Sequence, residues 1–285
     1  MESTTILYVA ILLRICLTPV AFALVSKAQT RFGDWIGGRL IGLPLTTGPF
    51  LLTVCMTTSR STAAHAAAGV TSGQMAVVGF CSAYAWTARW MRPLRATATS
   101  LGIALAMVFV LSLLAGTWSA ATAVWVVIAT SLALWPWARH EPAAPADAGT
   151  DADPPRTPAP MLQRALISTF VVATMSTLVP ILGARPAGII TSAPVLLSII
   201  LPSTHRQNGA GGAAAVARGT IVSMAATVAF SAVLASTLPS MSVAAALLLS
   251  ASVLCALITA TPLLDRLLAQ ISPALLGQAR APAHP

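Results

Sequence analysis

Charged residues are scarce in this sequence. They make up 8% of its 285 residues, whereas a typical soluble domain carries about 25%. A surface that faces water on all sides cannot be built from so few charges, which excludes a soluble globular protein. Hydrophobic residues make up 56% of the chain, and the mean hydropathy is +0.83. The sequence therefore predicts an integral membrane protein.

Acidic residues are fewer still: there are seven, and none lies inside an apolar run. Their absence there excludes carboxylate-bound metal sites and carboxylate proton relays within a membrane. The four cysteines are far apart in the sequence and form no CxxC pair, so we expect small buried hydrophobes rather than zinc ligands. The sequence also lacks HExxH, paired-carboxylate and glycine-rich phosphate-loop motifs. We therefore expect no enzyme activity, no cofactor and no metal site.

Apolar runs, by contrast, recur along the chain. A run of about 18 or more apolar residues is long enough to cross a bilayer as a helix, and the alternating segments of outer-membrane barrels are absent. The sequence predicts an all-α polytopic protein of about nine transmembrane helices. Their expected ranges are 5–26, 40–58, 64–88, 97–115, 120–137, 165–182, 186–203, 212–235 and 241–262.

Basic residues give the expected orientation. In a soluble protein the net charge of +9 would suggest nucleic acid, but here the basic residues lie in short loops between apolar runs. With nine spans, thirteen of the sixteen basic residues fall on one side, while only Arg60 and Arg185 fall on the other. Five tryptophans, Trp86 and Trp90 among them, fall at the strongly basic side. We expect a multi-pass membrane protein with the N-terminus outside, the C-terminus in the cytoplasm, the lipid bilayer as partner and no nucleic-acid partner.

A polar linker divides the chain into two membrane halves. Residues 139–160 hold six prolines and four of the seven acidic residues, a composition that cannot bury a core. We expect a five-helix half at 1–138 and a four-helix half at 161–285, joined by this cytoplasmic linker. The last segment, from Leu263, is too short and too charged to cross and is expected to lie along the interface.

The two halves resemble each other in the order of their motifs. The matched positions are Arg14 with Arg164, Gly42 with Gly188, and Pro49 with Pro194. The matched spans are an odd number of crossings apart, so they cross in opposite directions, as in the inverted repeats of many transporters. A further match, "LAGTW" from Leu114 with "LASTL" from Leu234, would place both segments outside, which a clean inversion forbids. Either this match is chance or the second half has lost a helix.

The four-span second half has a glycine-to-proline break in its second span, from Gly188 to Pro194, and a glycine, Gly219, that opens its third. In these features it resembles the small GlpM-type bacterial membrane proteins. The resemblance covers about half of the chain. It implies a polytopic inner-membrane protein and no defined chemistry.

Spans 2 and 7 are interrupted near their midpoints by glycine and proline. Proline frees a backbone carbonyl, and lipid tolerates freed backbone groups only where protein or water covers them. Hydroxyl residues precede each proline, as they do at helix starts, so each break would direct a half-helix N-terminus at the membrane midplane, where it favours an anion. The candidate substrate-binding residues are Thr46, Thr47, Gly48, Pro49, Thr191, Ser192, Ala193 and Pro194, and the helix-break glycines are Gly42 and Gly188.

Arg14 completes the candidate site. It lies within the first span, where an unpaired charge is costly, and no carboxylate lies inside any span to pair with it. A bound anion, or carbonyls freed by a break, would satisfy its guanidinium. The alternative is that Arg14 extends to the outer surface.

These features favour a permease or channel for a small anionic solute. The alternative is a structural or assembly factor of the inner membrane, whose breaks only shape helix packing. A membrane enzyme is the third reading and has the least support. A homo-oligomer is compatible with the sequence but is not specified by it.

Overall fold

The computed structural model describes residues 27, 31, 33–45, 47–114, 124–127, 129–130 and 179–278. Over these residues the chain is all-helical, without strands. Four of the described helical stretches are long and apolar enough to cross a membrane: Arg60–Thr87, Pro93–Leu113, Ala184–Thr237 and Val243–Ala260. The all-α membrane class predicted from the composition therefore agrees with the described part of the chain.

The first group of helices comprises α2 (Asp34–Ile41), α3 (Thr47–Thr57), α4 (Arg60–Thr87) and α5 (Pro93–Leu113). The long helix α4 begins after Ser59, whose hydroxyl accepts a hydrogen bond from the Thr62 N–H at 3.2 Å. Helix α5 begins with proline, which lacks the N–H that a first-turn residue would leave unpaired.

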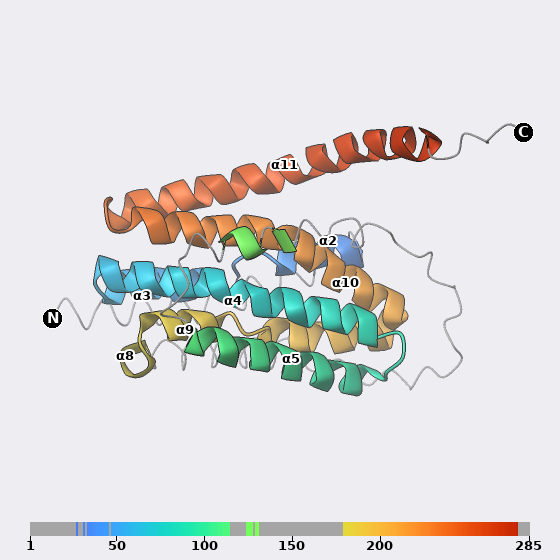
Figure 1. Cartoon of the computed structure of the whole chain (residues 1–285), viewed down its shortest axis with the longest axis horizontal. Coiled ribbons are helices and arrows are strands. Elements are labelled where there is room, and N and C mark those ends of the chain that lie inside the picture. The colour runs from blue at the N-terminus through green and yellow to red at the C-terminus, as the bar shows by residue number, and fades with distance from the viewer. Residues whose placement is uncertain are drawn as a thin grey trace, which may run out of the picture.

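The second group comprises α8 (Val179–Leu182), α9 (Ala184–Thr191), α10 (Val195–Thr237) and α11 (Val243–Gln278). Helix α10 is interrupted at Gly209, whose φ of 71° and ψ of −176° are non-helical. This positive φ is easily adopted by glycine and rarely by other residues. Residues 195–208 and 210–237 are therefore two helical rods with a sharp turn between them (Figure 1).

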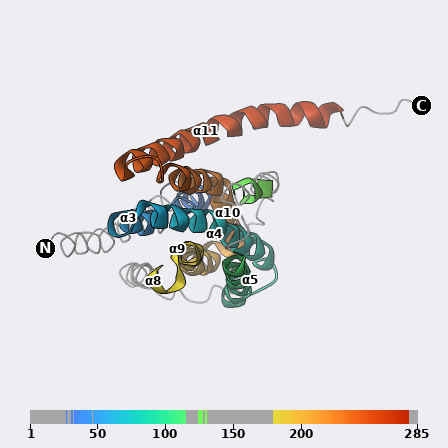
Figure 2. The ribbon, with the colours of Figure 1, turned by 60° about the vertical axis from the view of Figure 1, so that its left-hand side comes forward.

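Helix α4 and the second rod of α10 are antiparallel and form the centre of the bundle. Arg60, at the start of α4, donates from Nη1 to the carbonyl of Met241 just beyond α10, at 3.4 Å. Farther along, the Thr71 and Ser231 hydroxyls are 3.0 Å apart. We call the end of the bundle with these first contacts the Arg60 end, and the opposite end, where α5 begins, the Arg92 end. Helix α11 starts beside α10 and diverges from the bundle towards its C-terminal end (Figures 1 and 2).

The two short helices pack against the long ones through glycine. A β-carbon on Gly38 of α2 would overlap the backbone of Val216 in α10, and one on Gly188 of α9 would overlap the backbone of Ala66 in α4. Gly69 of α4 packs in the same way against the carbonyl of Arg185. Such close approach is typical of helix contacts in membranes, because small residues let backbones touch.

Elements of the first group recur in the second at a spacing of 150 residues. Gly33 precedes α2 with a φ of 86°, and Gly183 precedes α9 with a φ of 84°. Helix α4 ends at Thr87 and α10 at Thr237, while α5 begins at Pro93 and α11 at Val243. The Gly188 contact with Ala66 corresponds by this spacing to the Gly38 contact with Val216.

Several predicted boundaries differ from the helices. The segment 40–58 is two helices, α2 and α3, because Pro44 and the residues around it do not continue the helical hydrogen bonds. The last segment was expected to be a separate interfacial piece, but α11 continues through it to Gln278. Arg218 was counted with the cytoplasmic basic residues, near the start of span 212–235, and is instead buried within α10. Spans 5–26, 120–137 and 165–182 and the linker 139–160 lie wholly or mostly outside the described residues, so the count of nine stays a prediction.

The predicted register between the halves also differs from the spacing of the helices. Gly42 was matched with Gly188 and Pro49 with Pro194 from the letters alone. In the structure, Gly42 ends α2 as Ser192 ends α9, and the carbonyl of Pro44 accepts from Gly48 N–H at 2.8 Å. The carbonyl of Pro194 likewise accepts from Ser198 N–H at 2.9 Å, so Pro194 corresponds to Pro44.

Candidate functional site

The breaks between α2 and α3 and between α9 and α10 meet inside the bundle. They border a cavity of about 40 Å³ together with side chains of α4 and of the second rod of α10. A water needs about 10–15 Å³ of such space, so the cavity has room for only a few non-hydrogen atoms. Its lining includes Gly42, Leu45, Thr47, Gln74, Val77, Ser192, Ala193, Pro194, Met224 and Thr227.

Gln74 is the feature of this cavity with the clearest chemical meaning. Its side chain is 3% exposed and borders the cavity, and no hydrogen bond from it to a described residue is recorded. Leaving a buried amide unpaired costs about 1–3 kcal/mol, and the cost is larger in a bilayer, where no solvent replaces the missing partner. An amide offers two donors and an acceptor, so a bound solute or water in the cavity would satisfy it.

The hydroxyl groups around the cavity hold the ends of the short helices. Thr227 donates from Oγ1 to the carbonyl of Gly42 at 2.6 Å, which satisfies the last carbonyl of α2. Ser192 Oγ lies 3.1 Å from the Gly188 carbonyl and 3.3 Å from the Val70 carbonyl of α4. These hydroxyls thereby satisfy carbonyls at the ends of α2 and α9, where the helical hydrogen bonds stop.

The predicted site residues separate into three sets. Thr47, Ser192, Ala193 and Pro194, with the break glycine Gly42, line the cavity. Gly48 and Pro49 lie in the first turn of α3, and Thr191 ends α9 with its hydroxyl bonded to the Ala187 carbonyl at 2.7 Å, so these three do not line it.

Two more predicted residues, Arg14 and Thr46, lie outside the described residues. Gly188, predicted as a break glycine, lies inside α9 and serves the contact with Ala66. Its role is close packing between helices rather than a turn of the backbone.

Gln74 was missed by the sequence analysis. The candidate site was predicted from glycine, proline and charged residues, and Gln74 belongs to none of these types. A signal was present, since Gln74 is the one side-chain amide inside any of the nine predicted spans. A polar side chain in a membrane span usually faces the bundle interior and often marks a functional site.

A second and larger cavity lies at the Arg60 end. Its volume is about 450 Å³, and it is lined by Ser61, Ala64, His65 and Ala68 of α4, by Arg185 of α9, and by Ala232, Ala235 and Ser236 of α10. We call it the vestibule. Its lining is mostly apolar, and its charged or titratable side chains are Arg185 and His65.

The described residues contain no group of three or more histidine, cysteine, aspartate or glutamate side chains that could hold a metal ion. Comparisons with protein-family models, curated proteins and solved structures found no match for this chain.

Proposed function

We propose that this protein is a membrane permease or channel that moves a small anionic solute through the cavity between its two helix breaks. One observation carries the proposal: both breaks meet at a small cavity that is bordered by the buried side-chain amide of Gln74. Broken helices that meet near the membrane midplane are the usual construction of a transporter site. A bundle that served packing alone would gain stability from an apolar residue there.

We further propose that the chain has nine spans in two halves related as an inverted repeat. The antiparallel course of α4 and α10, which occupy corresponding places in the two groups of helices, supports this arrangement. The equal spacing of the helix starts and ends in the two groups supports it as well. Alternating access would then follow from a rocking of one half against the other about the central cavity.

The solute class follows from the groups around the path. The vestibule carries Arg185 and His65, and Arg60 lies at the same end. The one acidic side chain that the structure describes, Asp34, lies at the opposite end, bonded to Asn208 at 2.7 Å. Half-helix N-termini at the cavity add partial positive charge. These positive charges would attract a small anion. Arg14 is proposed as a further partner for the bound anion.

The proposed location is a bacterial inner membrane, with the N-terminus outside and the C-terminus in the cytoplasm. In that orientation the Arg60 end is external. Trp86 and Trp90, both largely exposed, lie at the Arg92 end beside several arginines, as expected for a cytoplasmic interface.

The test is flux in sealed proteoliposomes with a panel of small anions, such as chloride, nitrate and thiocyanate. We expect saturable flux of at least one anion. The variant Gln74→Met should abolish it, since methionine has a similar length but offers no amide. Gly102→Ala is the matched control, because a β-carbon at Gly102 of α5 meets nothing within 4 Å. Absence of flux for the whole panel in a correctly inserted protein would contradict the proposal.

A second candidate function is a structural or assembly factor of the membrane. The glycine contacts at Gly38, Gly69, Gly188 and Gly219 favour it, since they are explained by packing alone. In that case Gln74→Met would leave every cellular phenotype of the protein unchanged. We propose no enzymatic activity.

A further inference from the structure

The vestibule and the central cavity lie one after the other along the α4 and α10 pair. On α4 the vestibule ends at Ala68, and the central cavity begins at Gln74. On α10 the vestibule ends at Ala232, and the central cavity begins at Thr227. The residues between them on the two helices include Thr71 and Ser231.

Thr71 and Ser231 form the hydrogen bond that separates the two cavities. Their hydroxyl oxygens are 3.0 Å apart, and both residues are completely buried. No other side-chain hydrogen bond between α4 and the second rod of α10 is recorded among the described residues. The Thr71–Ser231 contact is therefore the one recorded side-chain hydrogen bond that joins these two helices between the two cavities.

Opening this contact leaves neither hydroxyl without a partner. Thr71 Oγ1 already lies 2.9 Å from the carbonyl of Ala67, and Ser231 Oγ lies 3.1 Å from the carbonyl of Thr227. Each hydroxyl can donate to its own helix when the helices separate. Since burial of an unsatisfied donor is the main penalty for breaking a buried hydrogen bond, this closure can break at low cost.

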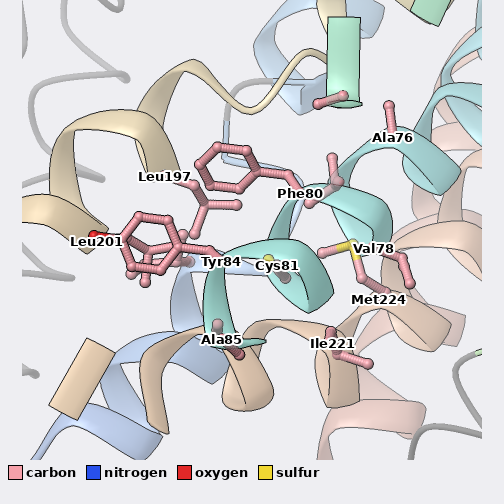
Figure 3. Close-up of a cluster of buried hydrophobic side chains, with 14 of the residues drawn as sticks. Ala76, Val78, Phe80, Cys81, Tyr84, Ala85, Leu197, Leu201, Ile221 and Met224 are labelled. Atoms are coloured by element: carbon pink, nitrogen blue, oxygen red, sulfur yellow. The ribbon is translucent and has the colours of Figure 1, made fainter. Parts of the chain in front are cut away.

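The corresponding contact at the Arg92 end has no such property. At the 150-residue spacing, Ile221 takes the place of Thr71, and Cys81 takes the place of Ser231. Both belong to a buried apolar cluster with Phe80, Tyr84 and Leu201 (Figure 3). Separating these side chains would expose apolar surface from several residues at once.

We propose that Thr71 and Ser231 are a gate between the vestibule and the central cavity, through which the solute enters from the Arg60 end. The proposal rests on the function proposed above. Gating by two hydroxyls fits a small solute, because a separation of the helices by one side chain suffices to connect the cavities.

The gate is tested by the reaction of single cysteines with a membrane-impermeant methanethiosulfonate, added separately to each side of sealed vesicles. The background replaces Cys16, Cys55, Cys81 and Cys255 with alanine. Ala68→Cys reports on the vestibule, and Val77→Cys on the central cavity. We expect Ala68→Cys to react quickly from the Arg60 side and Val77→Cys to react slowly.

Thr71→Ala is then combined with Val77→Cys. We expect the rate from the Arg60 side to rise about tenfold, since loss of one hydrogen bond shifts an opening equilibrium by that order. Ser72→Ala is the matched control, because Ser72 is its equally buried neighbour and its hydroxyl bonds to Ala68 of its own helix at 3.1 Å. Thr71→Ser, which keeps the hydroxyl, should restore the slow rate.

Equal rates for Thr71→Ala and Ser72→Ala would overturn the gate, as would an unreactive Ala68→Cys. Faster labelling from the Arg92 side alone would overturn it too. The labelling needs no transport, so a gate that responds as expected in a protein without flux would count against the proposed function and not against the path.

Discussion

The two ends of the α4 and α10 pair share the same glycine contacts between backbones but differ in how their side chains pack. At the Arg60 end the helices enclose a vestibule of about 450 Å³, closed from the centre by one hydrogen bond. At the Arg92 end, Phe80, Cys81 and Tyr84 of α4 pack in a buried apolar cluster (Figure 3). Such a difference is expected of an alternating-access protein in which few side-chain contacts close the path on one side of the binding cavity and many contacts close it on the other.

Side chains rather than helix geometry produce this difference. Ala68 borders the vestibule, whereas its counterpart Arg218 is buried and occupies space. The side chains at the two ends of this antiparallel pair can thus differ while the glycine contacts between backbones are alike.

The glycine contacts are shared by both ends, and their removal should have the largest effect. Gly69→Ala and Gly219→Ala would each drive a β-carbon into a carbonyl, that of Arg185 and that of Trp35. We expect each to destabilise the protein by about 3 kcal/mol or to prevent insertion, because backbone cannot give way as a side chain can. The measurement is the unfolding midpoint in detergent.

Gly102→Ala should leave that midpoint unchanged or raise it slightly, because alanine favours helix and nothing lies within 4 Å. A large loss for Gly69→Ala with none for Gly219→Ala would contradict the equivalence of the two contacts.

Gln74→Met copies the counterpart residue Met224 into the central cavity. We expect stability to rise by about 1 kcal/mol, since an unpaired buried amide is removed, while anion flux falls below detection. This opposite movement of stability and function distinguishes a binding residue from a structural one. Loss of both together would indicate that Gln74 supports the fold instead.

Copying the packed end onto the hollow end should have a smaller effect. In the double variant Thr71→Ile and Ser231→Cys, the gate becomes the apolar pair found at Ile221 and Cys81. We expect stability to fall by about 1–2 kcal/mol, because isoleucine adds a methylene at a fully buried position, and flux to fall several-fold because the apolar pair separates less easily than the two hydroxyls. Undiminished flux would show that solute does not pass this contact.

The smallest effect is expected at Tyr84, whose phenol lies 3.3 Å from His205 Nδ1 at the Arg92 end. The rings are also in edge contact, with centroids 6.1 Å apart. Tyr84→Phe keeps the ring and removes a long hydrogen bond. We therefore expect the free energy of unfolding to fall by less than about 1 kcal/mol. A loss several times larger would mean that the packed end depends on this polar contact rather than on apolar burial.

The sequence was sufficient for the class of fold and for the existence of the breaks. A chain surrounded by lipid needs few charged residues and apolar runs long enough to cross the bilayer, so composition and run length predicted membrane helices directly. Proline and glycine near residues 42–49 and 188–194 predicted interruptions, and the structure has one at Pro44 and one before Val195. Thr47, Ser192 and Pro194, proposed as binding residues, line one cavity, although the register in which they were matched differs by several residues from the helix spacing.

The register between the two halves, the role of Gln74 and the proposed gate depend on contacts between distant segments, which a single sequence does not specify. Pro49 seemed the counterpart of Pro194 because both end a similar motif, yet the hydrogen bonds of Pro44 match those of Pro194. Arg218 was counted as a cytoplasmic charge, and the structure shows that its side chain is buried within α10. Gln74 gains meaning only from the cavity beside it, and the gate only from the packing of two distant segments.

Alternating access at the central cavity is tested most directly by spin-label distances at matched positions of the two ends. Ser61 with Ser236 spans the vestibule, and Gly211 with Trp86 is the corresponding pair at the Arg92 end; all four positions are exposed. Distances are measured in lipid without solute and with a saturating concentration of the transported anion. We predict that one distance lengthens as the other shortens, and that Gln74→Met abolishes both changes. Two distances that stay fixed, or that change in the same direction, would contradict alternating access.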